Sequence, residues 1–245
     1  MVSIKPFTLK QEKEIVAEGE LLSTQMFEAY LQEEGVSSAL LPALDFMLID
    51  ADNEPVLSFT EEKLTSMLSQ LEDKEIFITQ GFICRNPRGE VDNLKRGGSD
   101  YTAAIVAAAL NATELEIWTD VNGMFTANPK IVKQAQPIAT ISYQEAMELS
   151  HFGAKVLYPP TIQPVLRKNI PILIKNTFEP EAVGTYISND VVSQTNPVKG
   201  ISHIDNIALL TLEGPGMVGV SGSSKRLFEV LSHENINVIF ITQAS

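Results

Sequence analysis

Short β-rich apolar runs alternate with amphipathic helical segments along most of this chain. We expect a buried strand and its exit at residues 38–49, and strands at residues 76–79, 115–119 and 170–174. The segments with apolar residues at helical spacing lie at residues 12–34, 60–71, 100–112 and 142–150. Strands that alternate with helices favour an α/β fold whose sheet is parallel or mostly parallel and is covered on both faces.

The composition changes near residue 187. Residues 188–197 are polar and typical of a linker, and after them we expect a strand at 207–212, a helix at 223–232 and a strand at 236–242. A lone β-α-β unit cannot bury the face of its sheet, so either more chain or another subunit must complete it. The expected organisation is a domain at 1–187, a linker at 188–199 and the first part of a second domain at 200–245.

The chain has a formal net charge of −13, which would repel nucleic acids and would also repel ATP. No nucleic-acid partner is therefore expected, and a nucleotide site would need local cations. No apolar stretch reaches the roughly 20 residues of a membrane helix, and the N-terminus carries no secretory signal. The one cysteine, Cys84, excludes an internal disulfide framework. The sequence therefore predicts a cytoplasmic protein without a membrane partner.

The densest chemical signal is the segment Lys-Arg-Gly-Gly-Ser-Asp-Tyr-Thr at residues 95–102. Gly97 and Gly98 allow left-handed dihedral angles and a close approach of the backbone. Ser99 can cap a helix that begins near Asp100, and the unpaired N–H groups at that helix end favour an anion. Arg96 adds a guanidinium fork that suits a carboxylate. The alternative is an ordinary tight turn before a capped helix, and the spacing alone does not separate the two.

Two further positions place polar groups where a ligand could lie. Thr119 and Asp120 stand at the end of an expected strand, and such ends line the ligand crevice in open α/β sheets. They could hold a ribose or a metal ion bound to phosphates, although a simple turn at Asp120 is the more common arrangement. Lys155 is flanked by small and apolar residues, as a lysine that points into a cleft would be, although a lysine at a solvated helix end is commoner.

Residues 214–219 match the pattern G-x-G-x-x-G between an expected strand and an expected helix, which is the context of a dinucleotide site. However, the next strand ends in residues 243–245, which include no acidic residue for a ribose, so a dehydrogenase is disfavoured. No G-x-x-x-x-G-K-[ST] segment is present, which excludes a P-loop kinase. The three histidines lack the spacing of metal ligands, so no metal site built by the protein alone is expected.

Three motifs resemble those of the aspartokinase family in order and spacing. They are Arg-Gly-Gly-Ser-Asp-Tyr-Thr-Ala-Ala at 96–104, Ile-Trp-Thr-Asp-Val-Asn-Gly at 117–123 and Phe-Gly-Ala-Lys-Val-Leu at 152–157. The segment Gly-Glu-Leu-Leu-Ser at 19–23 is similar to the substrate-loop motif of that family, so the resemblance covers about residues 14–186. It implies the amino-acid kinase fold, a carbamate kinase-like three-layer αβα sandwich with a mostly parallel sheet.

Other segments resemble more specific relatives. Residues 142–150 and 197–202 are similar to the bifunctional aspartokinase–homoserine dehydrogenases. Residues 214–217 and 241–243 resemble the start of a regulatory ACT domain, which implies a partial ferredoxin-like βαβ unit at the end of the chain. ACT domains bind amino-acid effectors at this kind of strand–helix loop, so the resemblance accounts for the glycine pattern without a dinucleotide.

The resemblance implies ATP-dependent phosphorylation of the β-carboxylate of L-aspartate to 4-phospho-L-aspartate, the first step of lysine, threonine and methionine biosynthesis. Arg96 would bind the α-carboxylate of aspartate, and Glu20 would bind its amino group. The acceptor pocket would be lined by Gly97, Gly98 and Ser99. A carboxylate acceptor is already ionised at neutral pH, so no strong base is needed. Asp100 would then orient cationic groups.

The resemblance also implies a nucleotide site, which matches Thr119, Asp120, Phe125, Lys130, Lys155 and Val156. Lys155 would take part in catalysis together with Asp100. Phe125 stands where the family usually has tyrosine and can still stack, and Lys130 replaces an arginine and keeps its charge. Mg²⁺ would arrive with ATP, without a dedicated protein cage.

The ACT resemblance implies an effector, threonine or lysine, near Met217 and Gln243, and a homo-oligomer that pairs through this domain. Aspartokinases open with Lys-Phe-Gly-Gly-Thr-Ser, whose lysine contacts the transferring phosphates, and nothing like it precedes residue 14. Two hypotheses stay open: an N-terminally truncated aspartokinase, and a catalytically incompetent module that retains amino-acid and nucleotide binding and a regulatory role. A carbamate or glutamate kinase relative fits less well, because the Arg96 segment and the ACT tail point to aspartate.

Overall fold

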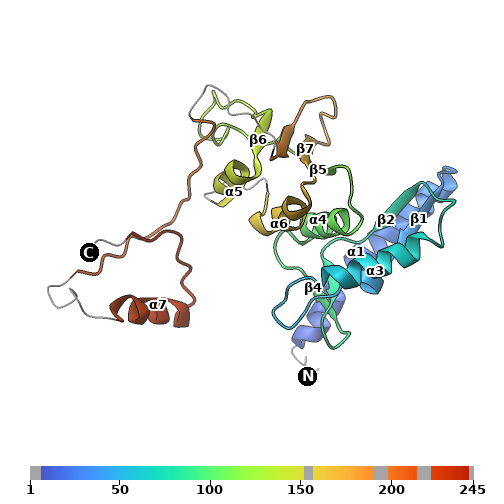
Figure 1. Cartoon of the computed structure of the whole chain (residues 1–245), viewed down its shortest axis with the longest axis horizontal. Helices are drawn as coiled ribbons and strands as arrows, with labels where there is room; N and C mark the ends of the chain where they lie inside the picture. Colours follow the sequence, from blue (N-terminus) through green and yellow to red (C-terminus); the bar gives the residue numbers. More distant parts are fainter. Residues whose placement is uncertain (1–6, 152–156, 190–197, 214–221, 243–245) are drawn as a thin grey trace, which may run out of the picture. The chain divides into compact units, whose positions relative to one another are not determined.

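The computed structural model describes residues 7–151, 157–189, 198–213 and 222–242 (Figure 1). The chain divides into two compact units, Met1–Ile204 and Asp205–Ser245. The first unit holds an alternation of helices and strands, and the second holds helix α7 (Ser223–His233). Among the described residues, no helix is long and apolar enough to cross a bilayer.

Two pairs of short strands lie in the N-terminal part of the first unit. β1 (Ser38–Leu41) pairs in parallel with β2 (Ile76–Thr79), and β3 (Ile83–Arg85) pairs antiparallel with β4 (Val91–Asn93). The turn of residues 80–82 connects β2 to β3. This turn lies close to the glycine segment that the sequence singled out, because a Cβ on Gly81 would come within 2.9 Å of Ser99.

The largest sheet has the strand order β5-β7-β8-β6. Its members are β5 (Leu115–Thr119), β6 (Thr140–Ser142), β7 (Ile172–Asn176) and β8 (Thr185–Ser188). β5 runs parallel to β7 and β6 parallel to β8, while β7 and β8 are antiparallel. Three of the five pairings among the described strands are therefore parallel, which confirms the predicted mostly parallel α/β arrangement.

The main hydrophobic core lies on one face of this sheet. Burial alternates along β7, where Ile172 and Ile174 are buried and the residues between them are half-buried. Helices α4 (Gly98–Ala109), α5 (Tyr143–His151) and α6 (Pro159–Lys168) contribute the other side of this core. Helix α4 is rich in alanine, and because these side chains are small, α6 packs closely against it.

A second core lies among α1 (Leu9–Glu33), α2 (Ala43–Phe46), α3 (Leu57–Leu68) and the two small strand pairs. Its fully buried side chains include Phe46 and Leu64. Cys84 is also fully buried there, and burial, with the nearby Asp92 carboxylate, raises the pKa of its thiol to about 12. The thiol is therefore a packing group, as its isolation in the sequence suggests.

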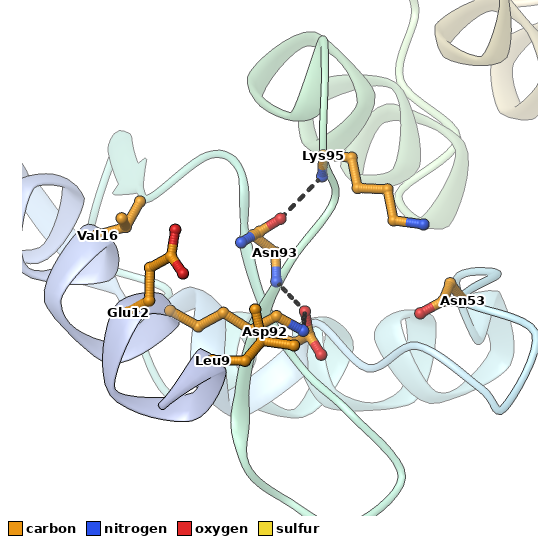
Figure 2. Close-up of a pocket in the computed structure, with 8 residues that line it drawn as sticks. Leu9, Glu12, Val16, Asn53, Asp92, Asn93 and Lys95 are labelled. Atoms are coloured by element: carbon orange, nitrogen blue, oxygen red, sulfur yellow. Dashed lines mark hydrogen bonds and ion pairs between the residues drawn. The ribbon is translucent and has the colours of Figure 1, made fainter. Parts of the chain in front are cut away.

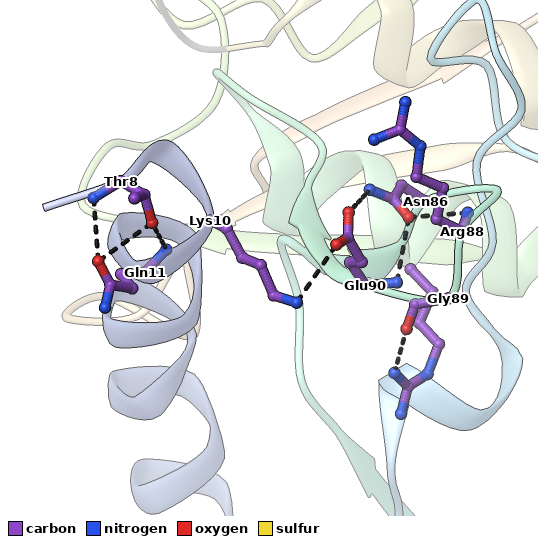
Figure 3. A network of polar contacts seen from close by, with 8 residues as sticks. Thr8, Lys10, Gln11, Asn86, Arg88, Gly89 and Glu90 are labelled. Carbon is purple, nitrogen blue, oxygen red and sulfur yellow. Dashed lines mark hydrogen bonds and ion pairs between the residues drawn. The ribbon is translucent and has the colours of Figure 1, made fainter.

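Helix α1 begins with a capping box and is tied at its first turn to the connection between β3 and β4 (Figure 3). The Thr8 hydroxyl accepts a hydrogen bond from the Gln11 amide, and the Gln11 side chain accepts one from the Thr8 amide. Lys10 Nζ lies 3.2 Å from Glu90 Oε1, and Glu90 also accepts a hydrogen bond from Asn86. These contacts fix where the long helix starts.

The second unit differs from the sequence prediction in one respect. Helix α7 forms where a helix was expected at 223–232, but neither 205–213 nor 234–242 contains a strand. A strand needs a partner for its backbone hydrogen bonds, and no described segment pairs with these two. Apolar side chains remain exposed in both, including Leu209 at 91% and Phe240 at 75%.

Candidate active site

The glycine pair of residues 97 and 98 begins helix α4 in a crowded position. Gly97 is the N-cap of α4 and lies in the left-handed region, with a φ of 70°. A Cβ on Gly97 would lie 2.7 Å from the Cβ of Tyr158, and a Cβ on Gly98 would lie 2.7 Å from the ring of Phe82. The predicted need for both glycines is confirmed, since a side chain at either would collide with its neighbour.

Ser99 does not cap this helix. No side-chain hydrogen bond caps α4, and Ser99 is the second residue inside it. The predicted cap was wrong because the left-handed turn at Gly97 starts the helix before Ser99 is reached. Ser99 is instead an exposed residue of the first turn.

Two cationic side chains directly precede the glycine pair. Lys95 has a φ of 60°, which is a strained conformation for a residue other than glycine. The Asn93 side chain holds it in place by accepting a hydrogen bond from the Lys95 amide at 3.2 Å. Lys95 and Arg96 are exposed, and within the described residues neither side chain has a hydrogen-bond or ion-pair partner. The Gly98 amide donates to the Lys95 carbonyl, but the Ser99 and Asp100 amides have no partner among the described residues. The start of α4 therefore presents two cations and two unpaired backbone N–H groups, an arrangement that suits an anion.

Asp100 occupies the first turn of α4 and is half-buried. Burial raises the pKa of its carboxyl above the ordinary value. No described residue donates a hydrogen bond to this carboxylate or forms an ion pair with it. A half-buried carboxylate without a partner can orient a cationic group that enters the site.

Glu20 lies near the middle of α1 and is half-buried. Its backbone carbonyl accepts a hydrogen bond from the Thr24 hydroxyl at 2.8 Å. Its carboxylate has no hydrogen-bond or ion-pair partner among the described residues, and it makes no direct contact of this kind with Arg96. The structure connects the two segments indirectly, through the turn of residues 80–82.

A second polar group lies at the carboxyl ends of β5 and β7. Thr119 is paired in register with Asn176, and the Thr119 hydroxyl donates to Asp120 Oδ1 at 3.2 Å. The Asn176 amide donates to Asn122 at 2.6 Å, and Asn122 in turn donates to Glu179 at 2.9 Å. The prediction that Thr119 and Asp120 stand at the end of a strand is confirmed, since β5 ends at Thr119. The sequence reasoning missed Asn176, although its place at the end of an expected strand was a signal of the same kind.

The loop after β5 carries the other nucleotide positions predicted from the sequence. Phe125 is half-buried and forms a bridge with Pro137, whereas Lys130 is exposed. The loop is closed by a pair of hydrogen bonds between Thr126 and Gln136, at 2.9 and 3.0 Å. Phe125 and Lys130 therefore lie on a defined loop that leaves the sheet beside Thr119 and Asp120.

Thr185, on β8, anchors the start of this loop and was also missed by the sequence reasoning. Its hydroxyl accepts from the Met124 amide at 2.8 Å and donates to the Ile138 carbonyl at 2.6 Å. Gly123 has a φ of 90° and lies directly against Thr185, which leaves no room for a side chain. No sequence signal links residues so far apart in the chain.

An open cavity of about 360 Å³ lies between the start of α1 and β4 (Figure 2). It is lined by Leu9, Glu12, Lys13, Val16, Asn53, Asp92, Asn93 and Lys95. Two of the lining residues form an ion pair, in which Lys13 Nζ lies 2.6 Å from Asp92 Oδ1. Of the predicted site segment only Lys95 reaches this cavity, so it borders the glycine turn and does not coincide with it.

Four of the predicted site residues, Lys155, Val156, Met217 and Gln243, lie outside the described residues. Apart from Glu20, which lies on α1, the other predicted site residues fall into two groups. One group is the start of α4 with the neighbouring turn, and the other is the set of strand ends with the loop after β5. Nowhere in the described ranges do three or more His, Cys, Asp or Glu side chains gather as metal ligands.

Comparison with known proteins identifies the family of this chain. Residues 5–176 match the amino acid kinase family, and residues 210–245 match an ACT domain. A bifunctional aspartokinase/homoserine dehydrogenase of Haemophilus influenzae is 41% identical over 228 residues, which are 93% of this chain and 28% of that protein. The chain thus spans about a quarter of the length of this relative.

Solved structures give the same family. E. coli aspartokinase III in complex with aspartate and ADP superposes with a TM-score of 0.77 and 32% identity, over 99% of this chain and 54% of that one. The same enzyme with lysine and aspartate gives a TM-score of 0.75 over the same shares. The family match covers most of the described first unit and includes both polar groups. The chain belongs to the amino acid kinase family, and the relatives that it matches over nearly its whole length are aspartokinases.

Proposed function

We propose that this chain carries the substrate and nucleotide sites of an aspartate kinase, which transfers the γ-phosphoryl group of ATP to the β-carboxylate of L-aspartate. The observation that carries the proposal is the start of α4. There the left-handed Gly97 turn presents Arg96, Lys95 and unpaired backbone N–H groups to solvent without a competing partner among the described residues. The likeness to an aspartokinase solved with aspartate and ADP supports it.

At neutral pH aspartate carries two carboxylates and one ammonium group, and the site offers complementary charges. Arg96 binds the α-carboxylate through its guanidinium fork, and the Glu20 carboxylate binds the ammonium group. The acceptor pocket is lined by Gly97, Gly98 and Ser99. A side chain at either glycine would fill the space against Phe82 or Tyr158 and distort this pocket.

The nucleotide lies at the strand ends and the following loop. Thr119 and Asp120 contact the nucleotide there, Phe125 stacks, and the Lys130 charge offsets phosphate charge, together with Lys155 and Val156. Lys130 is exposed and has no ion-pair partner among the described residues, so its charge is available. In a chain of net charge −13 such local cations decide whether ATP can bind.

Mg²⁺ fits this site as a companion of ATP. The ion usually takes one or two carboxylates together with substrate phosphates, and the exposed Asp120 carboxylate beside the Thr119 hydroxyl supplies such a ligand set. When bound, the ion neutralises phosphate charge. The acceptor carboxylate is ionised at neutral pH, so the protein needs no strong base. Asp100 orients cationic groups near the acceptor.

The second unit is the regulatory part of this proposal. With the domain limits taken as 1–187, 188–199 and 200–245, the last segment is the first part of an ACT domain that binds lysine or threonine near Met217 and Gln243. E. coli aspartokinase III has been solved with lysine, which supports an amino-acid effector. Pairing of two ACT units would give segments 207–212 and 236–242 the strand partners that they lack here.

The test is an assay of ADP release by the purified chain with MgATP and aspartate, with hydroxylamine added to trap the acyl phosphate. Aspartate-dependent ADP release with formation of the hydroxamate is expected, and asparagine, which lacks the β-carboxylate, should give neither. Binding of aspartate and MgATP in calorimetry without any turnover would support the non-catalytic module instead. Absence of binding by both ligands would overturn both hypotheses.

A further inference from the structure

Gln80 is a buried polar residue between the two segments that supply the aspartate site, and nothing in the proposed chemistry uses it. Its side chain is completely inaccessible to solvent. The side-chain oxygen accepts a hydrogen bond from the Ala43 amide at 2.8 Å, and the side-chain nitrogen donates to the Thr24 hydroxyl at 2.7 Å. A buried amide with both ends engaged fixes the distance between the groups it joins.

The Thr24 end of this link leads to Glu20. The Thr24 hydroxyl donates to the Glu20 carbonyl at 2.8 Å, one helical turn earlier on α1. Gln80 therefore holds α1 at the turn that carries the Glu20 carboxylate. It fixes both the rotation of the helix about its axis and its position along it.

The two residues after Gln80 hold the other half of the site. Gly81 lies against Ser99, since a Cβ on Gly81 would come within 2.9 Å of the Ser99 Cα. The Phe82 amide donates to the Thr102 hydroxyl at 3.0 Å. That hydroxyl donates to the Gly98 carbonyl at 2.9 Å, inside the first turn of α4. One short turn thus contacts α1 on one side and the glycine turn on the other.

We infer that Gln80 is a positioning residue for aspartate binding, which acts by holding Glu20 in register with the Arg96–Ser99 segment. The simpler alternative is that Gln80 only satisfies the Ala43 amide, because α2 begins without a side-chain cap of its own. That role needs only the oxygen of the amide. It does not require the second hydrogen bond to Thr24 or the contact of the next residue with Ser99. The inference rests on the proposed function, in which Glu20 binds the ammonium group of aspartate.

The first test compares single variants by calorimetric titration with aspartate and, separately, with MgATP. Gln80→Met and Thr24→Val should each weaken aspartate binding by about tenfold, the equivalent of one lost hydrogen-bond contribution. Thr24→Ser keeps the hydroxyl and should bind normally. MgATP affinity should not change in any of them, because the strand-end group shares no contact with Gln80.

Gln32→Met is the matched control. Gln32 also lies on α1 and donates to the Ser38 carbonyl of β1 at 3.0 Å, but it lies three turns beyond Glu20. Its loss should reduce stability without a change in aspartate affinity. If Gln32→Met and Gln80→Met weaken aspartate binding equally, Gln80 is an ordinary structural residue and the inference is wrong.

The second test is a double-mutant cycle with Glu20→Ala. If Gln80 acts through Glu20, the Gln80→Met change should have little further effect on aspartate affinity once Glu20 has been removed. An equal loss in both backgrounds would overturn the inference, as would an unchanged affinity in a folded Gln80→Met protein. Failure of the wild-type chain to bind aspartate at all would instead overturn the proposed function, and the role of Gln80 in binding would fall with it.

Discussion

At the scale of single residues, the glycine turn before α4 depends on both conformation and space. Gly97 has a left-handed backbone and also abuts Tyr158, whereas Gly89 has a left-handed backbone, with a φ of 76°, and open space around its Cβ position. A comparison of substitutions at the two glycines therefore separates the energetic cost of the backbone conformation from the cost of crowding.

Gly97→Ala should destabilise the protein more than Gly89→Ala. A left-handed conformation costs a residue with a Cβ about 1–2 kcal/mol, and overpacking adds about 1–3 kcal/mol. Only the Gly97→Ala variant has both the conformational cost and the overpacking cost. Urea denaturation of the two variants and the parent measures the difference in the free energy of unfolding. Equal losses would show that Tyr158 moves aside at no cost and that the turn is less crowded than described.

Asp100 gives a prediction about pH. Burial raises the pKa of this carboxyl above its usual value of 3.8, so between the unfolded and folded pKa values the folded state binds more protons. Stability then falls as the pH rises through this window, and the loss persists at neutral pH. Asp100→Asn should therefore be more stable than the parent at pH 7, and the two should converge as the pH falls below about 3.8. A variant that is less stable than the parent at pH 7 would contradict the assignment of burial as the dominant effect.

Sequence reasoning succeeded for residues whose chemistry is local. The left-handed turn at Gly97 and the polar residues at the end of β5 follow from neighbours in the chain. The helix cap assigned to Ser99 was wrong, because the cap depends on where the backbone turns, which the sequence placed two residues too late. Gln80 and Thr185 could not be found from the sequence, since their hydrogen-bond partners lie far away along the chain. Gln80 donates to Thr24, and Thr185 donates to the Ile138 carbonyl.

At the scale of elements, the sequence missed strands β3, β4, β6 and β8, which have three or four residues each. β3 and β4 have three residues each, too few for a clear alternation of apolar and polar side chains, and they are fixed by pairing with each other. The apolar run at 38–49 was expected to hold a buried strand and its exit, and β1 ends at Leu41, after which Pro42 precedes the short helix α2. Helix α6 begins at Pro159, and proline at the first position of a helix is compatible with its geometry.

The segment that leaves the first unit is attached to two elements of the kinase core. Lys199 Nζ lies 2.8 Å from Glu145 Oε2 on α5, and the Ile201 amide donates to the Thr126 carbonyl in the loop after β5 at 2.8 Å. Partial burial opposes ionisation of Glu145, but the hydrogen bonds from Lys199 and Ser142 outweigh it and lower the pKa of this carboxyl. The chain thus leaves the core beside the proposed nucleotide loop.

Glu145→Gln should lower stability by less than about 1 kcal/mol at pH 7, because the glutamate is partly exposed to solvent. A depressed folded pKa contributes stability above the unfolded pKa, which is lost as the pH falls through the folded value. The difference between Glu145→Gln and the parent should therefore shrink as the pH falls below the usual carboxyl pKa of 4.5, and disappear once the folded carboxyl is protonated. Glu148→Gln on the same helix, an exposed residue without a described partner, is the control and should change little at any pH. A Glu145→Gln effect that does not depend on pH would show that the ion pair does not contribute.

At the scale of the whole molecule, the fold class and the family could be predicted from the sequence, because three separate motifs agree in order over much of the chain. The secondary structure of the second unit could not be predicted from the sequence. Its apolar patterns predict strands, but strands form only when their backbone groups find partners, and the described residues supply none for 207–212 or 236–242. Apolar periodicity indicates which face a segment can bury, and the available partners decide whether it is buried.

The net charge of −13 also acts at this scale, since it disfavours every anion that approaches the protein. Aspartate binding must therefore depend on particular cations, and Arg96 is the one on which the account rests. Arg88 offers a matched comparison because it is exposed, lies in the turn between β3 and β4, and its removal changes the net charge by the same amount.

The most direct measurement is a calorimetric titration of the parent, Arg96→Ala and Arg88→Ala with aspartate. Loss of a charge-assisted contact should weaken binding to Arg96→Ala by about ten- to a hundredfold, while Arg88→Ala should bind like the parent. Circular dichroism should show that both variants remain folded. Nearly unchanged affinity in a folded Arg96→Ala protein, or an equal loss in both variants, would contradict the assignment of the start of α4 as the aspartate site.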